Sequence, residues 1–68
     1  MLKKYTILNK DTHPYQIGER TSAGVLAYVY NGYFDDKSCT FTLYPQKGGY
    51  RAPGADVRKK RIHMSEVG

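Results

Sequence analysis

Apolar and polar residues alternate along much of this chain, with the period of two that is typical of half-buried β-strands. The clearest example is the segment 39–44, in which Cys39, Phe41 and Leu43 share one face. We predict that this face lies in the core and that the opposite face, which includes Tyr44, is turned toward water.

Four further segments are predicted to be strands, because β-branched and aromatic residues dominate their apolar positions. They are 4–8, 15–17 as a short edge strand, 24–30, and 58–64. Asn31-Gly32 is the strongest turn signal between them, since both residues tolerate the positive φ angles of a tight hairpin. A return strand is then expected to start at Tyr33, and a second polar turn is expected at 35–38.

The segment 21–31 is also compatible with a helix. Thr21 or Ser22 can cap such a helix, and apolar residues recur at helical spacing from Leu26 onward. An early glycine and two valines lower the helix propensity, so we favour a strand. The expected fold is all-β, either a small, strongly curved sheet of four or five strands or an SH3-like or OB-like barrel. The alternative is an α+β fold with one helix near 21–31.

Length and composition limit what the chain can be. Its 68 residues are expected to form one domain, 1–68, with a small core to which several of the seven tyrosines must contribute. The single cysteine, Cys39, excludes an internal disulfide framework, so we expect a reducing, cytoplasmic setting. No apolar run follows the basic residues at the start, so neither a signal peptide nor a membrane span is expected.

Motifs for catalysis, cofactors and metals are missing from the sequence. Asp35 and Asp36 are adjacent and read as a turn rather than an acid–base pair, and His13 has no partner in a known motif. His13, Cys39 and His63 do not have zinc-site spacing, and the glycines after Lys47 match no phosphate-binding loop. We therefore expect a protein that is not an enzyme and needs neither cofactor nor metal.

The positive charge is confined to one part of the chain. The formal net charge is +5, and the segment from Lys47 to Arg61 holds six basic residues against Asp56 alone, while the remaining charges balance. Polarised charge of this kind indicates a polyanionic partner.

Tyrosines and glycines lie among these cations. Lys and Arg neutralise phosphates, and tyrosine rings stack on unpaired bases. The same residues are also typical of a solvated strand edge, where lysine prevents edge-to-edge aggregation. The candidate nucleic-acid contacts are Tyr44, Lys47, Tyr50, Arg51, Arg58, Lys59, Lys60 and Arg61. Tyr28, Tyr30 and Tyr33 would extend this surface if they faced outward.

Two functions fit this pattern. The first is a non-enzymatic nucleic-acid-binding module, for single strands through tyrosine stacking or for duplex DNA through the basic segment, which could dimerise to raise avidity. The second is a small protein-binding module or inhibitor, of the kind that phages and mobile elements carry. It would dock on an acidic or nucleic-acid-binding surface of a host protein, where Tyr and Arg are typical anchors.

Overall fold

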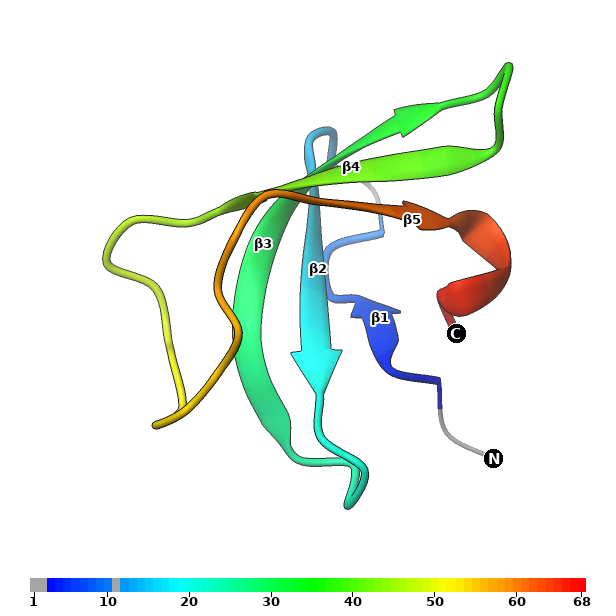
Figure 1. The fold of residues 1–68 in the computed structure, drawn as a ribbon. Helices are drawn as coiled ribbons and strands as arrows, with labels where there is room; N and C mark the ends of the chain where they lie inside the picture. The colour runs from blue at the N-terminus through cyan, green and yellow to red at the C-terminus, as the bar shows by residue number, and fades with distance from the viewer. Residues whose placement is uncertain (1–2, 11) are drawn as a thin grey trace.

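A computed structural model describes residues 3–10 and 12–68, which form a five-stranded antiparallel sheet (Figure 1). The strands are β1 (Tyr5–Ile7), β2 (Tyr15–Arg20), β3 (Leu26–Asp35), β4 (Thr40–Pro45) and β5 (Lys60–His63), followed by a 3-10 helix, η1 (Met64–Glu66). Each strand pairs with the next one along the chain, and the sheet curls into a half-barrel. The all-β prediction is confirmed, and the α+β alternative with a helix near 21–31 is wrong because most of this segment belongs to β3.

The long strand β3 gives the sheet its curvature. It pairs with β2 along its first part and with β4 along its second part. Near its start Glu19 lies opposite Tyr28 and Arg20 lies opposite Leu26, so Ala27 is one extra residue in β3. Such a bulge bends the strand and increases its twist. The bend turns the first part of β3 away from the direction of β4, as Figure 1 shows.

The end of the chain lies across the open side of the half-barrel. Val67 forms a parallel bridge with Tyr5 of β1, and the Gly68 amide donates a hydrogen bond of 2.9 Å to the Tyr5 carbonyl. The C-terminus and β1 are therefore neighbours, as they are in Figure 1. This contact links the segment after β5 to the first strand.

The core occupies the concave side of the sheet and is rich in tyrosine. Its buried members are Tyr5, Ile17, Tyr28, Tyr30, Phe41, Leu43 and Ile62. The rings of Tyr28 and Tyr30 meet edge to face, with centroids 5.0 Å apart. Phe41 and Leu43 are both buried, as the alternation along 39–44 predicts. Neither Tyr28 nor Tyr30 is available to a partner at the surface.

The predicted hairpin turn at Asn31-Gly32 is wrong, because β3 continues through both residues. Gly32 is required by packing rather than by a turn. A β-carbon placed on it would lie 2.6 Å from Cγ1 of Ile17 and 3.3 Å from Cδ2 of Leu43. The chain reverses instead at 36–39, close to the polar turn that the sequence predicts at 35–38.

Three other expectations need correction. Cys39 is exposed in this turn, with a φ of 54°, so it is not part of the core. β2 does not end at Gly18 and is not an edge strand, because it continues to Arg20 between β1 and β3. The last strand is shorter than 58–64, since Met64 begins η1. Within the described residues, no helix is long and apolar enough to cross a membrane.

Replacing Gly32 by alanine tests this packing. The added methyl group must displace Ile17 or Leu43, and such overpacking typically costs about 1–3 kcal/mol. We expect Gly32→Ala to lower the free energy of unfolding by this amount in urea titrations. The matched control is Gly49→Ala, whose methyl group meets only the flexible side chain of Gln46 and the carbonyl oxygen of Gln46 at 4.0 Å. A Gly32→Ala variant as stable as the control would contradict the described packing.

Candidate functional site

The outward face of β3, β4 and β5 gathers aromatic, amide and cationic side chains. Tyr30 and Gly32 of β3 are buried, so the alternate residues Asn31 and Tyr33 point to the other side of the sheet. Tyr44 lies opposite Asn31 on β4, and the register of β4 with β5 puts Arg61 opposite Thr42. We call this surface the outer tyrosine face. Its residues are Asn31, Tyr33, Tyr44, Lys59 and Arg61.

The two tyrosines of this face contact each other and remain accessible. Their ring centroids are 5.5 Å apart at an interplanar angle of 79°, and 43% of Tyr33 and 41% of Tyr44 is exposed. His13 packs edge to face on Tyr33, at 5.5 Å, and on Tyr15, at 5.3 Å. These contacts hold the rings in defined orientations, because edge-to-face pairs are favoured by the aromatic quadrupole.

A shallow hollow of about 370 Å³ lies on this face, lined by Asn31, Tyr33 and Tyr44. The Gln46 side chain donates a hydrogen bond of 2.9 Å from Nε2 to Oδ1 of Asn31. The hollow thus combines two aromatic walls with an amide whose orientation is fixed by a neighbour.

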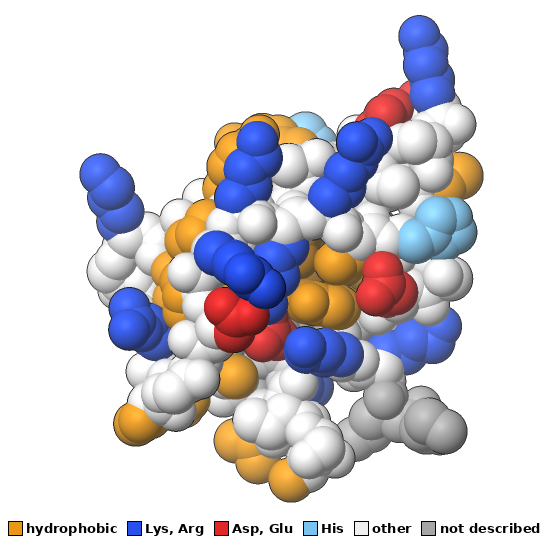
Figure 2. Space-filling model, viewed as in Figure 1, with side chains coloured by type: hydrophobic (Ala, Val, Ile, Leu, Met, Phe, Trp, Pro, Cys, Tyr) orange, Lys and Arg blue, Asp and Glu red, His pale blue; other side chains and the backbone are white. Residues whose placement is uncertain are grey.

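Cations border the aromatic rings. Lys59 Nζ lies 5.4 Å from the ring centroid of Tyr44, within cation–π range, and Arg61 is exposed on β5. Figure 2 shows Lys and Arg side chains projecting from the region of β4 and β5, with few Asp and Glu among them. The face therefore offers both a stacking surface and positive charge.

Four of the other predicted contact residues lie outside the outer tyrosine face. Lys47, Tyr50 and Arg51 are exposed on the loop after β4, where the Arg51 backbone bridges to that of Tyr28. Arg58 precedes β5 and forms an ion pair of 3.4 Å with Asp56. Both partners of this pair are largely exposed, so the pair adds little to stability.

Lys60 is the one predicted contact residue that points into the molecule. Its Nζ donates a hydrogen bond of 2.7 Å to Oε1 of Glu19, and only 13% of the Lys60 side chain and 8% of the Glu19 side chain are exposed. The Tyr30 hydroxyl lies 2.9 Å from the same carboxylate oxygen and 2.9 Å from the Asp56 carbonyl. Lys60 is therefore engaged in the interior and is poorly placed to meet a phosphate.

This network shifts the proton affinities of its members. Burial raises the pKa of Tyr30 to about 12, and the hydrogen bond to the Glu19 carboxylate adds to the effect. Burial lowers the pKa of Lys60, but its interactions with Glu19 and Tyr30 outweigh this and leave the pKa raised. Burial also raises the pKa of Tyr5 nearby. At neutral pH the network thus holds the Lys60 ammonium and the neutral Tyr5 and Tyr30.

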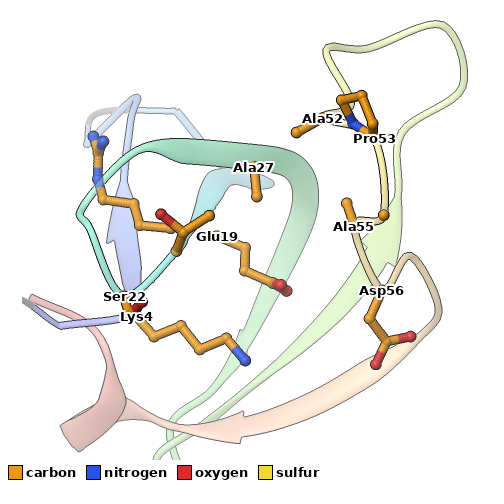
Figure 3. A pocket seen from close by; sticks show the side chains of 11 residues that line it. Lys4, Glu19, Ser22, Ala27, Ala52, Pro53, Ala55 and Asp56 are labelled. Atoms are coloured by element: carbon orange, nitrogen blue, oxygen red, sulfur yellow. The ribbon is translucent and has the colours of Figure 1, made fainter.

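A cavity of about 660 Å³ lies beside the network (Figure 3). Its walls come from β2, from the turn that follows β2 and from the segment 52–56, and Glu19 and Asp56 extend into it from opposite sides. Lys4 and Arg20 balance these two carboxylates. The cavity consequently has no excess of either charge to attract an ionic ligand.

Metal-binding clusters are missing from the part of the chain that the structure describes: no three His, Cys, Asp or Glu side chains are grouped to hold an ion. Cys39 lies on the exposed turn at 36–39, and its sulfur contacts the Asp36 carbonyl at 3.8 Å. No family model, no curated protein and no solved structure matches the chain.

Sequence reasoning named Tyr44, Lys59 and Arg61 and left Tyr33 open, but it missed Asn31 and His13. The hairpin turn predicted at Asn31-Gly32 conceals the place of Asn31 on a strand opposite Tyr44. His13 lies in a loop without a periodic pattern of apolar residues. Its contact partner Tyr33 is twenty residues further along the chain. Only continuous alternation from Tyr28 to Asp35 could have revealed Asn31 in advance.

The buried network should make the fold sensitive to alkaline pH. Tyr30 ionises at about 12 in the fold and at 10.0 when unfolded, so the unfolded chain gives up this proton first. Stability is then fully present below pH 10 and falls as the pH rises toward 12. The pKa of Lys60 is also raised in the fold, so deprotonation of Lys60 at high pH lowers the stability as well. We expect the unfolding temperature, followed by circular dichroism, to fall over this range.

Two phenylalanine variants separate this effect from general alkaline damage. Tyr30→Phe should be less stable at neutral pH by about 1 kcal/mol, because a buried hydrogen bond is lost, yet depend less steeply on pH above 10. Tyr50→Phe, at an exposed loop position, should keep the full alkaline dependence. An unchanged slope in Tyr30→Phe would show that Tyr30 is not its source.

Proposed function

We propose that the outer tyrosine face binds single-stranded nucleic acid without catalysing a reaction. The observation that carries the proposal is the accessible Tyr33–Tyr44 pair with Lys59 over the Tyr44 ring and Arg61 on the adjacent strand. Aromatic rings on a sheet, bordered by cations, are the elements from which single-strand-binding surfaces are built.

Each part of the face has a role in this proposal. Tyr33 and Tyr44 stack on bases, which must be unpaired to expose their flat faces. Lys59 and Arg61 neutralise the phosphates that follow the stacked bases, and the counterions released add salt-dependent affinity. Neighbouring strands are about 4.8 Å apart, so rings on β3 and β4 and cations beside and on β5 lie within the reach of a few nucleotides.

A single strand suits this surface better than a duplex. Reading of the major groove usually relies on an α-helix or a two-stranded ribbon that enters the groove. The described residues contain no α-helix, and the candidate residues lie on the outer surface of a curved sheet. Lys47, Arg51 and Arg58 supply attraction at longer range from the flanking segments. The exposed thiol of Cys39 fits a reducing compartment such as the cytoplasm.

Fluorescence anisotropy with labelled ten-nucleotide single strands tests the proposal. We expect Tyr44→Ala to lose about 1–3 kcal/mol of binding free energy, since one stacked base is lost. Lys59→Ala and Arg61→Ala should each weaken binding and reduce the slope of log Kd against log salt concentration by about one. A duplex of the same sequence should bind more weakly.

Matched controls come from cations and tyrosines outside the face. Lys10→Ala removes one charge at the groove formed with Tyr15 and Met64, and Tyr50→Ala removes an exposed ring from the loop after β4. Lys10→Ala should leave base stacking intact, and Tyr50→Ala should lose less binding free energy than Tyr44→Ala.

Absence of binding even at low salt would reject the proposal. An acidic protein surface, for which the same Tyr and Arg anchors are suited, would then be the partner to search for.

A further inference from the structure

We infer that the hollow on the outer tyrosine face selects a base that carries carbonyl oxygens, thymine or uracil, over adenine, and that the amide of Asn31 makes the selection. The inference rests on the proposed binding of single strands and adds to it a preference among bases. It is carried by three side chains that line one hollow, namely Asn31, Tyr33 and Tyr44.

The orientation of the Asn31 amide decides what the hollow can recognise. Its Oδ1 accepts the hydrogen bond from Gln46 Nε2, so the group left for a ligand is the Nδ2 amino group, which carries two donors. Gln46 does not offset this with an acceptor of its own. Its Oε1 is directed toward the loop, where a β-carbon on Gly49 would lie 3.1 Å from it, and Gln46 does not line the hollow.

Asn31 is held firmly enough to discriminate. It lies on β3 with a paired strand on each side, opposite Gln16 of β2 and opposite Tyr44 of β4. Side chains placed on such paired strands are positioned more precisely than side chains on loops. The contact between Gln46 and Asn31 adds a second constraint, because it fixes the rotation of the amide.

The bases differ in what they present to a donor. Thymine and uracil carry carbonyl oxygens that accept a hydrogen bond from an amino group, as thymine O4 does. Adenine has no carbonyl oxygen, and its N7 acceptor lies beside the N6 amino donor. A base stacked against Tyr44 with its edge toward Asn31 is therefore paired if it is thymine or uracil. Adenine N7 can also accept from Nδ2, but the adjacent N6 amino donor then meets Oδ1, which already accepts from Gln46, so adenine is less well matched than thymine or uracil.

The test compares binding of dT8 and dA8 by anisotropy to the full chain and to two variants. We expect the wild type to prefer dT8. In Asn31→Ala the ratio of the two dissociation constants should shift toward dA8 by about three- to tenfold, the value of one hydrogen bond. In Asn31→Asp the carboxylate keeps the bond from Gln46 but offers an acceptor to the base, so the ratio should shift at least as far.

The ratio of the two dissociation constants is compared between variants. Properties of the oligonucleotides themselves, such as the self-stacking of dA8, cancel in this comparison because they are the same for every variant. Gln16→Ala is the matched control, since Gln16 is an exposed amide opposite Asn31 on β2, and its ratio should equal that of the wild type. Circular dichroism establishes which variants are folded. One folded Asn31 variant is enough for the comparison with the wild type.

Three results are distinguishable. A ratio that moves in the Asn31 variants but not in Gln16→Ala supports the inference. Binding of both oligonucleotides with the same ratio in wild type and Asn31 variants overturns the inference and leaves the proposed function standing. If neither oligonucleotide binds at low salt, the proposed function fails and the inference fails with it.

Discussion

The buried contact between Glu19 and Lys60 is the interaction on which both the core and the outer face depend. It joins β2 to β5, two strands that are not neighbours in the sheet, across the concave side of the half-barrel. Burying two charges is costly unless they are paired and further hydrogen-bonded, and here Tyr30 supplies the additional bond. The pair also sets the orientation of β5. Because Lys60 points inward, the alternation of the strand turns its neighbours Lys59 and Arg61 outward beside Tyr44.

Tyrosine has two distinct uses in this chain. In the core, Tyr28 and Tyr30 provide apolar ring area, and their hydroxyls reach partners at the edge of the core, the Gln46 carbonyl for Tyr28 and the Glu19 carboxylate for Tyr30. On the outer face, the rings of Tyr33 and Tyr44 contact each other, and both keep part of their surface open. A small core benefits from rings that combine bulk with a polar end, since the end can lie where the interior meets water.

The sequence was sufficient to predict an all-β fold, the outward position of Tyr44 and the burial of Phe41 and Leu43, because alternation reports directly on which face is covered. The sequence was misleading at Asn31-Gly32. A glycine there is typical of a tight turn, but in this fold the packing of a strand requires the same glycine. Gly32 is needed because Ile17 crosses above it, and that contact comes from a different strand. Alternation along 58–64 does put Lys60 on the same face as Ile62, but the contact of Lys60 with Glu19 was hidden, since Glu19 is forty-one residues away in the chain.

The alternation of β5 also limits how this protein can change through evolution. The basic run from Arg58 to Arg61 looks interchangeable in composition, but its members occupy different environments. Inserting one uncharged residue between Lys60 and Ile62 would keep every charge, yet it would place these two side chains on opposite faces, so that one of them turns toward water. Viable length changes near this strand should therefore come in steps of two residues or be absorbed in the loop after β4, whereas exchange of lysine and arginine at positions 59 and 61 should be freely tolerated.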